Sequence, residues 1–66
     1  MSETMLYRLR KERNMTQAQL SAASGVHVQA IAKLERGERN ISNIQLSTAL
    51  ALADALQVDP HRFLAE

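Results

Sequence analysis

Apolar residues recur at the three- and four-residue spacing of amphipathic helices along most of this chain, and few β-branched residues alternate with polar ones as they do in strands. The first such stretch contains Leu6 and Leu9, which predict a helix over about residues 4–13. Ser2 or Thr4 is available to cap its N-terminus. Together with the many Ala, Leu, Gln and Arg residues, this pattern predicts an all-α fold.

A second helix is predicted over about residues 17–24. Thr16 and Gln19 have the spacing of a capping box, in which each side chain satisfies a free backbone amide of the first turn. Small side chains at 21–24 allow another helix to approach closely. Gly25 then ends the helix, because glycine adopts a left-handed backbone at little cost.

A third helix follows at once, over about residues 27–36, with Gly37 after its last turn. Ile31 and Leu34 share its inward side. The opposite side contains Gln29, Lys33 and Arg36, with Ala32 and Val28 beside them.

Two short helices joined by a tight glycine turn are typical of a helix-turn-helix that reads DNA. The outer side of the third helix fits that use, since amide, ammonium and small apolar groups all recognise base edges in the major groove. The alternative is an ordinary solvated face, because exposed Gln and Lys are common on any surface helix.

The start of the next helix is ambiguous in the sequence. Ser42 with Gln45 forms a second possible capping box, whereas Ser47 would begin a shorter helix after an extended connection. We favour Ser47, which leaves Ile44 and Leu46 as anchors tucked under the bundle.

The rest of that helix and the C-terminal segment complete the predicted core. The residues expected to pack inward are Leu52, Ala53 and Leu56. Asp59 and Pro60 are expected to cap a last short helix, with Pro60 at its first position. The apolar contacts of that helix come from Phe63 and Leu64. We therefore expect a compact bundle of five helices.

The order and spacing of these motifs resemble those of the phage-repressor and Cro-like helix-turn-helix family, also called the XRE family, from Leu6 to Leu64. The residues that carry the resemblance are Leu6, Leu9, Arg10, Met15, Thr16, Gln17, Leu20, Gly25, Val26, Ile31, Leu34, Glu35, Gly37, Leu52, Ala53, Asp54, Ala55, Leu56 and Val58. The resemblance implies a lambda-repressor-like DNA-binding domain in which the second helix braces against the DNA backbone and the third enters the major groove.

The same resemblance implies which residues contact double-stranded DNA. Phosphates would be held by Thr16 and Gln17, and bases would be faced by Val28, Gln29 and Lys33. Arg36, Arg39 and Asn40 would lie near the backbone. His27 departs from the Ser or Thr that is usual at its position. It either caps the third helix poorly or donates to a base or phosphate itself.

Charge is distributed unevenly although the net charge is only +1. Residues 8–39 include seven basic and three acidic residues, and the remainder of the chain has a negative net charge. One face can therefore be electropositive while the back is acidic, which orients a protein on a phosphate backbone. Arg10 and Glu35 both lie on inward sides of their helices and are expected to form an ion pair, as the family resemblance also implies; separate solvation is the alternative.

Other classes of function find little support in the sequence. The 66 residues suffice for a single domain, cysteine is absent, and no apolar run has the length of a signal or membrane span, so we expect a cytoplasmic protein. His27 and His61 have no partner at metal-ligand spacing. Neither a nucleophile elbow nor a glycine-rich phosphate loop is present. We expect no enzyme activity, no metal and no cofactor.

The expected role is a transcriptional regulator, a repressor rather than an activator by the family resemblance. One recognition helix covers only a few base pairs, so we expect a homodimer on a two-fold-related operator. The residues expected at the dimer interface are Leu56, Val58, Phe63 and Leu64. The alternative is a protein-interaction module, for instance the antitoxin of a toxin–antitoxin pair, with or without DNA binding.

Overall fold

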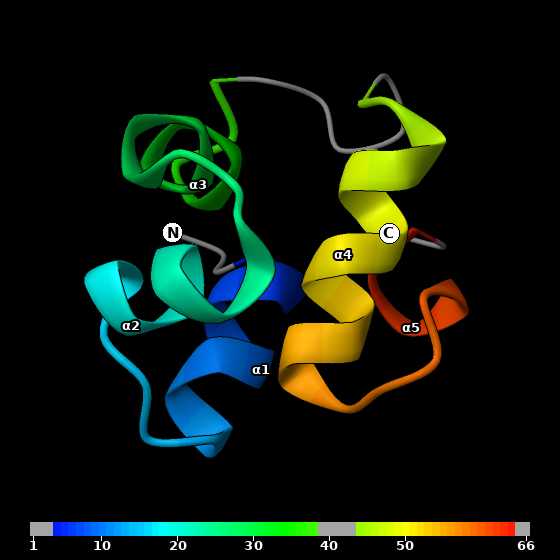
Figure 1. Cartoon of the computed structure of the whole chain (residues 1–66), viewed down its shortest axis with the longest axis horizontal. Helices are drawn as coiled ribbons and strands as arrows, with labels where there is room; N and C mark the ends of the chain where they lie inside the picture. Colours follow the sequence, from blue (N-terminus) through cyan, green and yellow to red (C-terminus); the bar gives the residue numbers. More distant parts are fainter. Residues whose placement is uncertain (1–3, 39–43, 65–66) are drawn as a thin grey trace.

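The computed structural model describes residues 4–38 and 44–64, without the side chains of the last two (Figure 1). Its helices are α1 (Met5–Glu12), α2 (Gln17–Ser24), α3 (Val28–Glu35), α4 (Leu46–Leu56) and α5 (His61–Leu64), and these described ranges contain no strand. The all-α prediction is confirmed. The prediction of five helices is not matched. Among the described residues, four helices have eight residues or more, and α5 is a single turn of four residues.

Local hydrogen bonds fix where the first two helices begin. The Thr4 hydroxyl accepts from the backbone N–H of Tyr7 at 3.2 Å, so Thr4 is the N-cap of α1. At α2 the capping box is complete. The N–H of Gln19 donates to the Thr16 hydroxyl at 3.0 Å, and the N–H of Thr16 donates to Gln19 Oε1 at 2.8 Å. The N-termini of both helices were predictable from the sequence, because the partners of each capping bond lie within three residues of each other.

Gly25 sets the turn between α2 and α3. Its φ is +79°, in the left-handed region, and its N–H donates to the carbonyl of Ser21 at 2.8 Å. A Cβ built at this position would meet no atom within 4 Å, so only backbone strain favours glycine here. The short turn brings α3 onto α2, and the two helices pack against each other.

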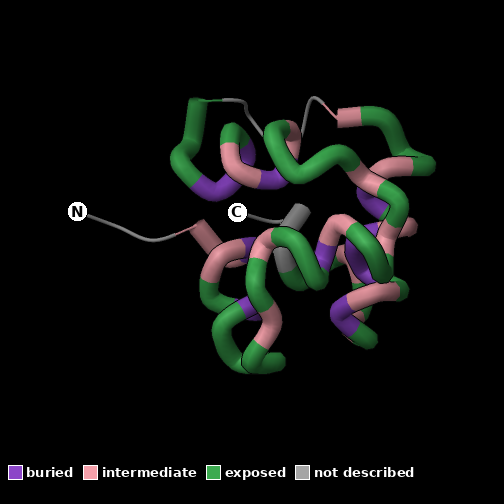
Figure 2. Tube along the Cα trace, turned by 60° about the vertical axis from the view of Figure 1, so that its left-hand side comes forward, coloured by how far each residue is buried: buried purple, intermediate pink, exposed green. Residues whose placement is uncertain are grey.

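Among the described residues, nine buried apolar residues from α1, α2, α3 and α4 form the core, and Figure 2 draws them in purple together with the buried Arg10 and Glu35. The nine apolar residues are Leu6, Leu9, Leu20, Ile31, Leu34, Ala49, Leu52, Ala53 and Leu56. Helix α2 packs on both α3 and α4, while α1 packs on α3 and α5. The inward positions predicted for Leu52, Ala53 and Leu56 are confirmed.

The predicted start of α4 is wrong. The helix begins at Leu46 with Gln45 as its N-cap, so Ser47 lies inside the first turn and Ser42 lies outside the described residues. Ile44 packs against the core as expected. Leu46, in contrast, is 69% exposed instead of tucked under the bundle, because it lies with the exposed Leu50 on the outer side of α4.

At the C-terminal end, Asp59 caps α5 through its side chain. The N–H of His61 donates to Asp59 Oδ1 at 2.9 Å. This bond and the one between the His61 ring and Asp59 hold the pKa of the Asp59 carboxyl below its ordinary value. Pro60 immediately precedes the first helical residue instead of occupying it. No described helix has the length and apolar character needed to cross a membrane.

The predicted dimer interface needs one correction. Leu56 is fully buried in the core of the single chain, and Val58 is partly buried and packs against the same core. Leu56 is therefore unavailable to a second copy. The side chains of Phe63 and Leu64 lie outside the described residues.

Candidate nucleic-acid interface

A buried ion pair joins α1 to the end of α3. Arg10 donates from Nε to Glu35 Oε2 at 2.5 Å and from its second terminal nitrogen to Oε1 at 3.0 Å. The two side chains are only 8% and 3% exposed, respectively. Arg10 also donates to the carbonyl of Met15 at 2.6 Å, which ties the α1–α2 turn to the same guanidinium. The pairing expected from the inward positions of Arg10 and Glu35 is present.

Gln17 adds a contact that the sequence did not predict. Its Nε2 donates to Glu35 Oε1 at 3.0 Å, so a residue assigned to phosphate binding has its side-chain amide engaged inside the domain. The backbone N–H groups at this end of α2, in contrast, are not all engaged. In the described part of the chain, the N–H groups of Gln17 and Ala18 have no acceptor, while those of Thr16 and Gln19 are used by the capping box. Free amides at a helix N-terminus form an anion-binding position.

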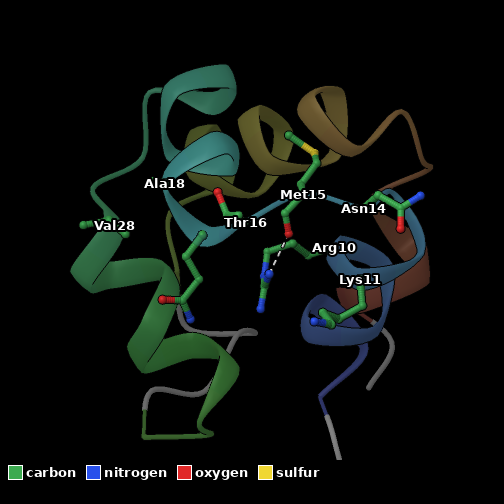
Figure 3. A pocket seen from close by; sticks show the side chains of 8 residues that line it. Arg10, Lys11, Asn14, Met15, Thr16, Ala18 and Val28 are labelled. Atoms are coloured by element: carbon green, nitrogen blue, oxygen red, sulfur yellow. Dashed lines mark hydrogen bonds between the residues drawn. The ribbon is translucent and has the colours of Figure 1, made fainter.

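An open hollow of about 660 Å³ lies beside these amides (Figure 3). It is lined from the end of α1, the α1–α2 turn and the first turn of α2, with Val28 contributing from α3; its lining residues are Arg10, Lys11, Asn14, Met15, Thr16, Gln17, Ala18 and Val28. Lys11 is exposed there. The Arg10 charge is paired with Glu35, whereas Lys11 forms no ion pair with the described residues and its ammonium lies 5.9 Å from the centre of the Tyr7 ring. Lys11 therefore supplies the available positive charge of this hollow. The sequence signal for Lys11 was its place in the basic stretch of the first helix.

The outer side of α3 is exposed as the periodicity predicted. Gln29, Lys33 and Arg36 are exposed, whereas Ile31 and Leu34 are buried on the opposite side. The side chains of Gln29 and Lys33 form no hydrogen bond or ion pair with the described residues. Both polar groups are therefore available to a ligand. Arg39 and Asn40, also assigned to DNA contact, lie outside the described residues.

His27 is the N-cap of α3. Its Nδ1 accepts a hydrogen bond from the backbone N–H of Gln29 at 3.1 Å, so this nitrogen carries no proton in the arrangement. The proton of the neutral ring then resides on Nε2, which leaves a donor on an exposed side chain. Capping and donation, posed as alternatives by the sequence, are therefore compatible in one tautomer.

Arg36 is exposed but has a partner. Its Nε donates to Glu38 Oε2 at 2.6 Å, and both side chains are about half exposed. This hydrogen bond, reinforced by the attraction between the charges, raises the pKa of Arg36 and lowers the pKa of Glu38. Lys33 also lowers the pKa of Glu38 by its charge. The acidic Glu38 thus lies beside the basic residues at the end of α3. Counting the charges in the sequence did not predict this pairing.

Two short helices, a left-handed glycine between them and an exposed outer side on the second define a helix-turn-helix domain. The family model for helix-turn-helix matches residues 6–63 of this chain. The chain therefore belongs to the XRE, or lambda-repressor-like, helix-turn-helix family, a family of DNA-binding regulators. No curated protein and no solved structure gives a significant match to the chain.

Proposed function

We propose that the protein binds specific sequences in double-stranded DNA by placing the outer side of α3 in the major groove. The observation that carries this proposal is the pair Gln29 and Lys33, exposed one turn apart, whose side chains form no hydrogen bond with the described residues. Glutamine recognises adenine with its amide, and lysine donates to the acceptors of guanine. Val28, exposed at the start of α3, is suited to contact a thymine methyl group.

Phosphate contacts in this proposal come mainly from α2 and the basic residues around it. The free amides of Gln17 and Ala18 and the ammonium of Lys11 border one hollow. An anionic phosphate entering it gains both the positive end of the α2 dipole and a lysine charge. The Thr16 hydroxyl already accepts a capping bond and retains its proton to donate. Arg36 supplies a further positive charge beyond the base-reading residues.

The biological role that follows is a transcriptional regulator, and specifically a repressor that occupies an operator as a homodimer. Two copies on a two-fold-related site double the length of DNA that is read, which a domain of this size needs for selectivity. The antitoxin alternative remains a hypothesis, because no feature of the described residues identifies a toxin as partner. Association with a toxin would be tested by co-purification from the native host.

The test is selection of binding sequences from a pool of random double-stranded DNA, followed by footprinting of the enriched site. We expect enrichment of one motif with two inverted half-sites whose centres lie about 10 base pairs, or one helical turn, apart. Gln29→Ala should weaken the enriched motif. Gln45→Ala is a matched control, because Gln45 is exposed at the start of α4 and its side chain forms no capping bond. Recovery of no motif at low salt would contradict sequence-specific binding.

A further inference from the structure

Helix α4 has a second apolar face that the core does not use. Its buried residues lie on one side, yet Leu46 is 69% exposed and Leu50 is 44% exposed. The two leucines are four residues apart and so lie one above the other on the outer side of the helix. Of the exposed large apolar residues in the described part of the chain, only Val28 lies outside α4, and it belongs to the candidate DNA interface.

This face is also without charge for two turns. From Ile44 to Ala53 the chain contains no acidic or basic residue, and Asp54 follows Leu50 at the next four-residue step. A solvated helix face ordinarily carries charged side chains. The stripe Leu46, Leu50 and Asp54, here called the α4 stripe, thus combines an apolar stretch with one acidic end.

We propose that the α4 stripe binds the α4 stripe of a second copy of this chain, with the two helices antiparallel and the two-fold axis near Leu50. In that arrangement Leu50 meets the Leu50 of the other copy, and Leu46 lies across from the other copy's Asp54. A two-fold contact of this kind requires a self-complementary surface, in which each end of the stripe matches the opposite end.

The ends of the α4 stripe match electrostatically. The N-terminus of α4 receives no hydrogen bond from the side chain of its N-cap, Gln45, and among the described residues no other side chain caps its first backbone amides, which carry the positive end of the helix dipole. Asp54 forms no ion pair with the described residues. Antiparallel pairing brings the carboxylate of each Asp54 to the uncapped N-terminus of the other α4, where a negative group is stabilising. This charge complementarity selects a second copy as the occupant.

The location of the α4 stripe is compatible with DNA binding. The start of α3 and the first turn of α4 border one hollow, whose lining includes His27 and Gln45. Leu46 and Leu50 do not line this hollow, and neither do the exposed polar residues on the outer side of α3. Contact through the α4 stripe therefore leaves the outer side of α3 open. The inference refines the homodimer of the proposed function, on which its biological setting rests. Because two turns of one helix form a small interface, we expect weak association in free solution and stronger association when two half-sites are adjacent.

The test uses a cysteine introduced at the proposed axis. The chain has no cysteine of its own, so Leu50→Cys creates one thiol per copy. Under mild oxidation, without DNA, the variant should form disulfide-linked dimers about tenfold faster than Ala23→Cys, because a specific contact raises the effective concentration of the paired thiols. Ala23 is an exposed residue of α2 and serves as the matched control. Equal rates for the two variants would overturn the proposal.

Charge variants give a second measurement that does not depend on disulfide geometry. Leu50→Glu alone and Leu50→Lys alone should each remain monomeric in sedimentation experiments, because like charges meet at the axis, while an equimolar mixture should associate. A mixture that associates no more than either variant alone would count against the α4 stripe. Both measurements omit DNA. Failure of motif selection with intact association would therefore contradict the proposed function and not the interface.

Discussion

Gln17, the first residue of α2, donates a hydrogen bond of 3.0 Å to Glu35, the last residue of α3. The same carboxylate receives two hydrogen bonds from Arg10 of α1. One buried acidic group therefore fixes three helices relative to one another. The relative orientation of α2 and α3, which a helix-turn-helix needs in order to touch backbone and bases together, depends on this group.

The Arg10–Glu35 pair should show strong energetic coupling. Removing either partner leaves the other charge buried and unpaired, which should lower the free energy of unfolding by about 3–5 kcal/mol. The double variant Arg10→Met with Glu35→Leu removes both charges and should recover much of that loss. Urea unfolding of the wild type, both single variants and the double variant measures the coupling. Additive effects within about 0.5 kcal/mol would show that the pair is not coupled.

The His27 cap should contribute to the stability of α3. His27→Ala removes the acceptor for the Gln29 N–H and should cost about 0.5–2 kcal/mol of unfolding free energy, whereas His27→Asn should retain most of it. Thermal or urea unfolding measures both variants. Gln45→Ala is the control, since that N-cap has no side-chain hydrogen bond to lose. Equal effects of alanine at the two caps would mean that the imidazole bond contributes little.

Base-reading and backbone-binding residues should separate in DNA binding. Gln29→Ala or Lys33→Ala should cost about 1–3 kcal/mol on the selected motif and relax the preference at particular base pairs. Arg36→Ala should weaken binding to all sequences alike and lower the salt dependence of the affinity. Binding titrations on the motif and on random DNA at several salt concentrations distinguish base-reading from backbone-binding residues. Arg62→Ala, an exposed charge outside α3, is the control. Equal losses on both DNAs for Gln29→Ala and Lys33→Ala would refute their assignment to bases.

Glu38 should restrain DNA binding through its pairing with Arg36. The hydrogen bond and charge of Arg36 hold the pKa of Glu38 low, so the carboxylate stays ionised at neutral pH and repels phosphates. Glu38→Gln should therefore increase affinity for motif and random DNA alike and steepen the salt dependence. Asp59→Asn removes one exposed negative charge near α5 and keeps a side-chain oxygen for the cap, so it separates this local effect from that of net charge. An unchanged or lower affinity of Glu38→Gln for random DNA would be evidence against such restraint.

Sequence reasoning succeeded where structure is set by neighbours along the chain. The Thr16 capping box and the turn at Gly25 each depend on residues within four positions, so both were readable from spacing. The Arg10–Glu35 pair spans 25 positions, yet two inward-pointing opposite charges made it predictable. The bond from Gln17 to Glu35 gave no such signal, because a glutamine at the start of a helix is equally suited to solvent or phosphate.

The errors lie where tertiary packing decided between local options. Ser47 is a good N-cap by type, but α4 begins earlier, and Ile44 packs against the core whereas Leu46 remains exposed. Leu56 was expected both to pack inward and to take part in the dimer interface, and its complete burial in the core confirms the first expectation and excludes the second. The base-reading assignment of Gln29 and Lys33 needed the family resemblance, since their exposure is also that of ordinary surface residues.

The two sides of α3 have consequences for how such a protein changes over time. Its inner residues Ile31, Leu34 and Glu35 hold the fold, while the side chains of Gln29 and Lys33 form no hydrogen bond or ion pair within the described structure. Substitutions at the two outer positions therefore carry little folding penalty. If the proposed function holds, exchanging a few surface side chains would redirect this domain to another DNA sequence, while the scaffold that presents them is inherited intact.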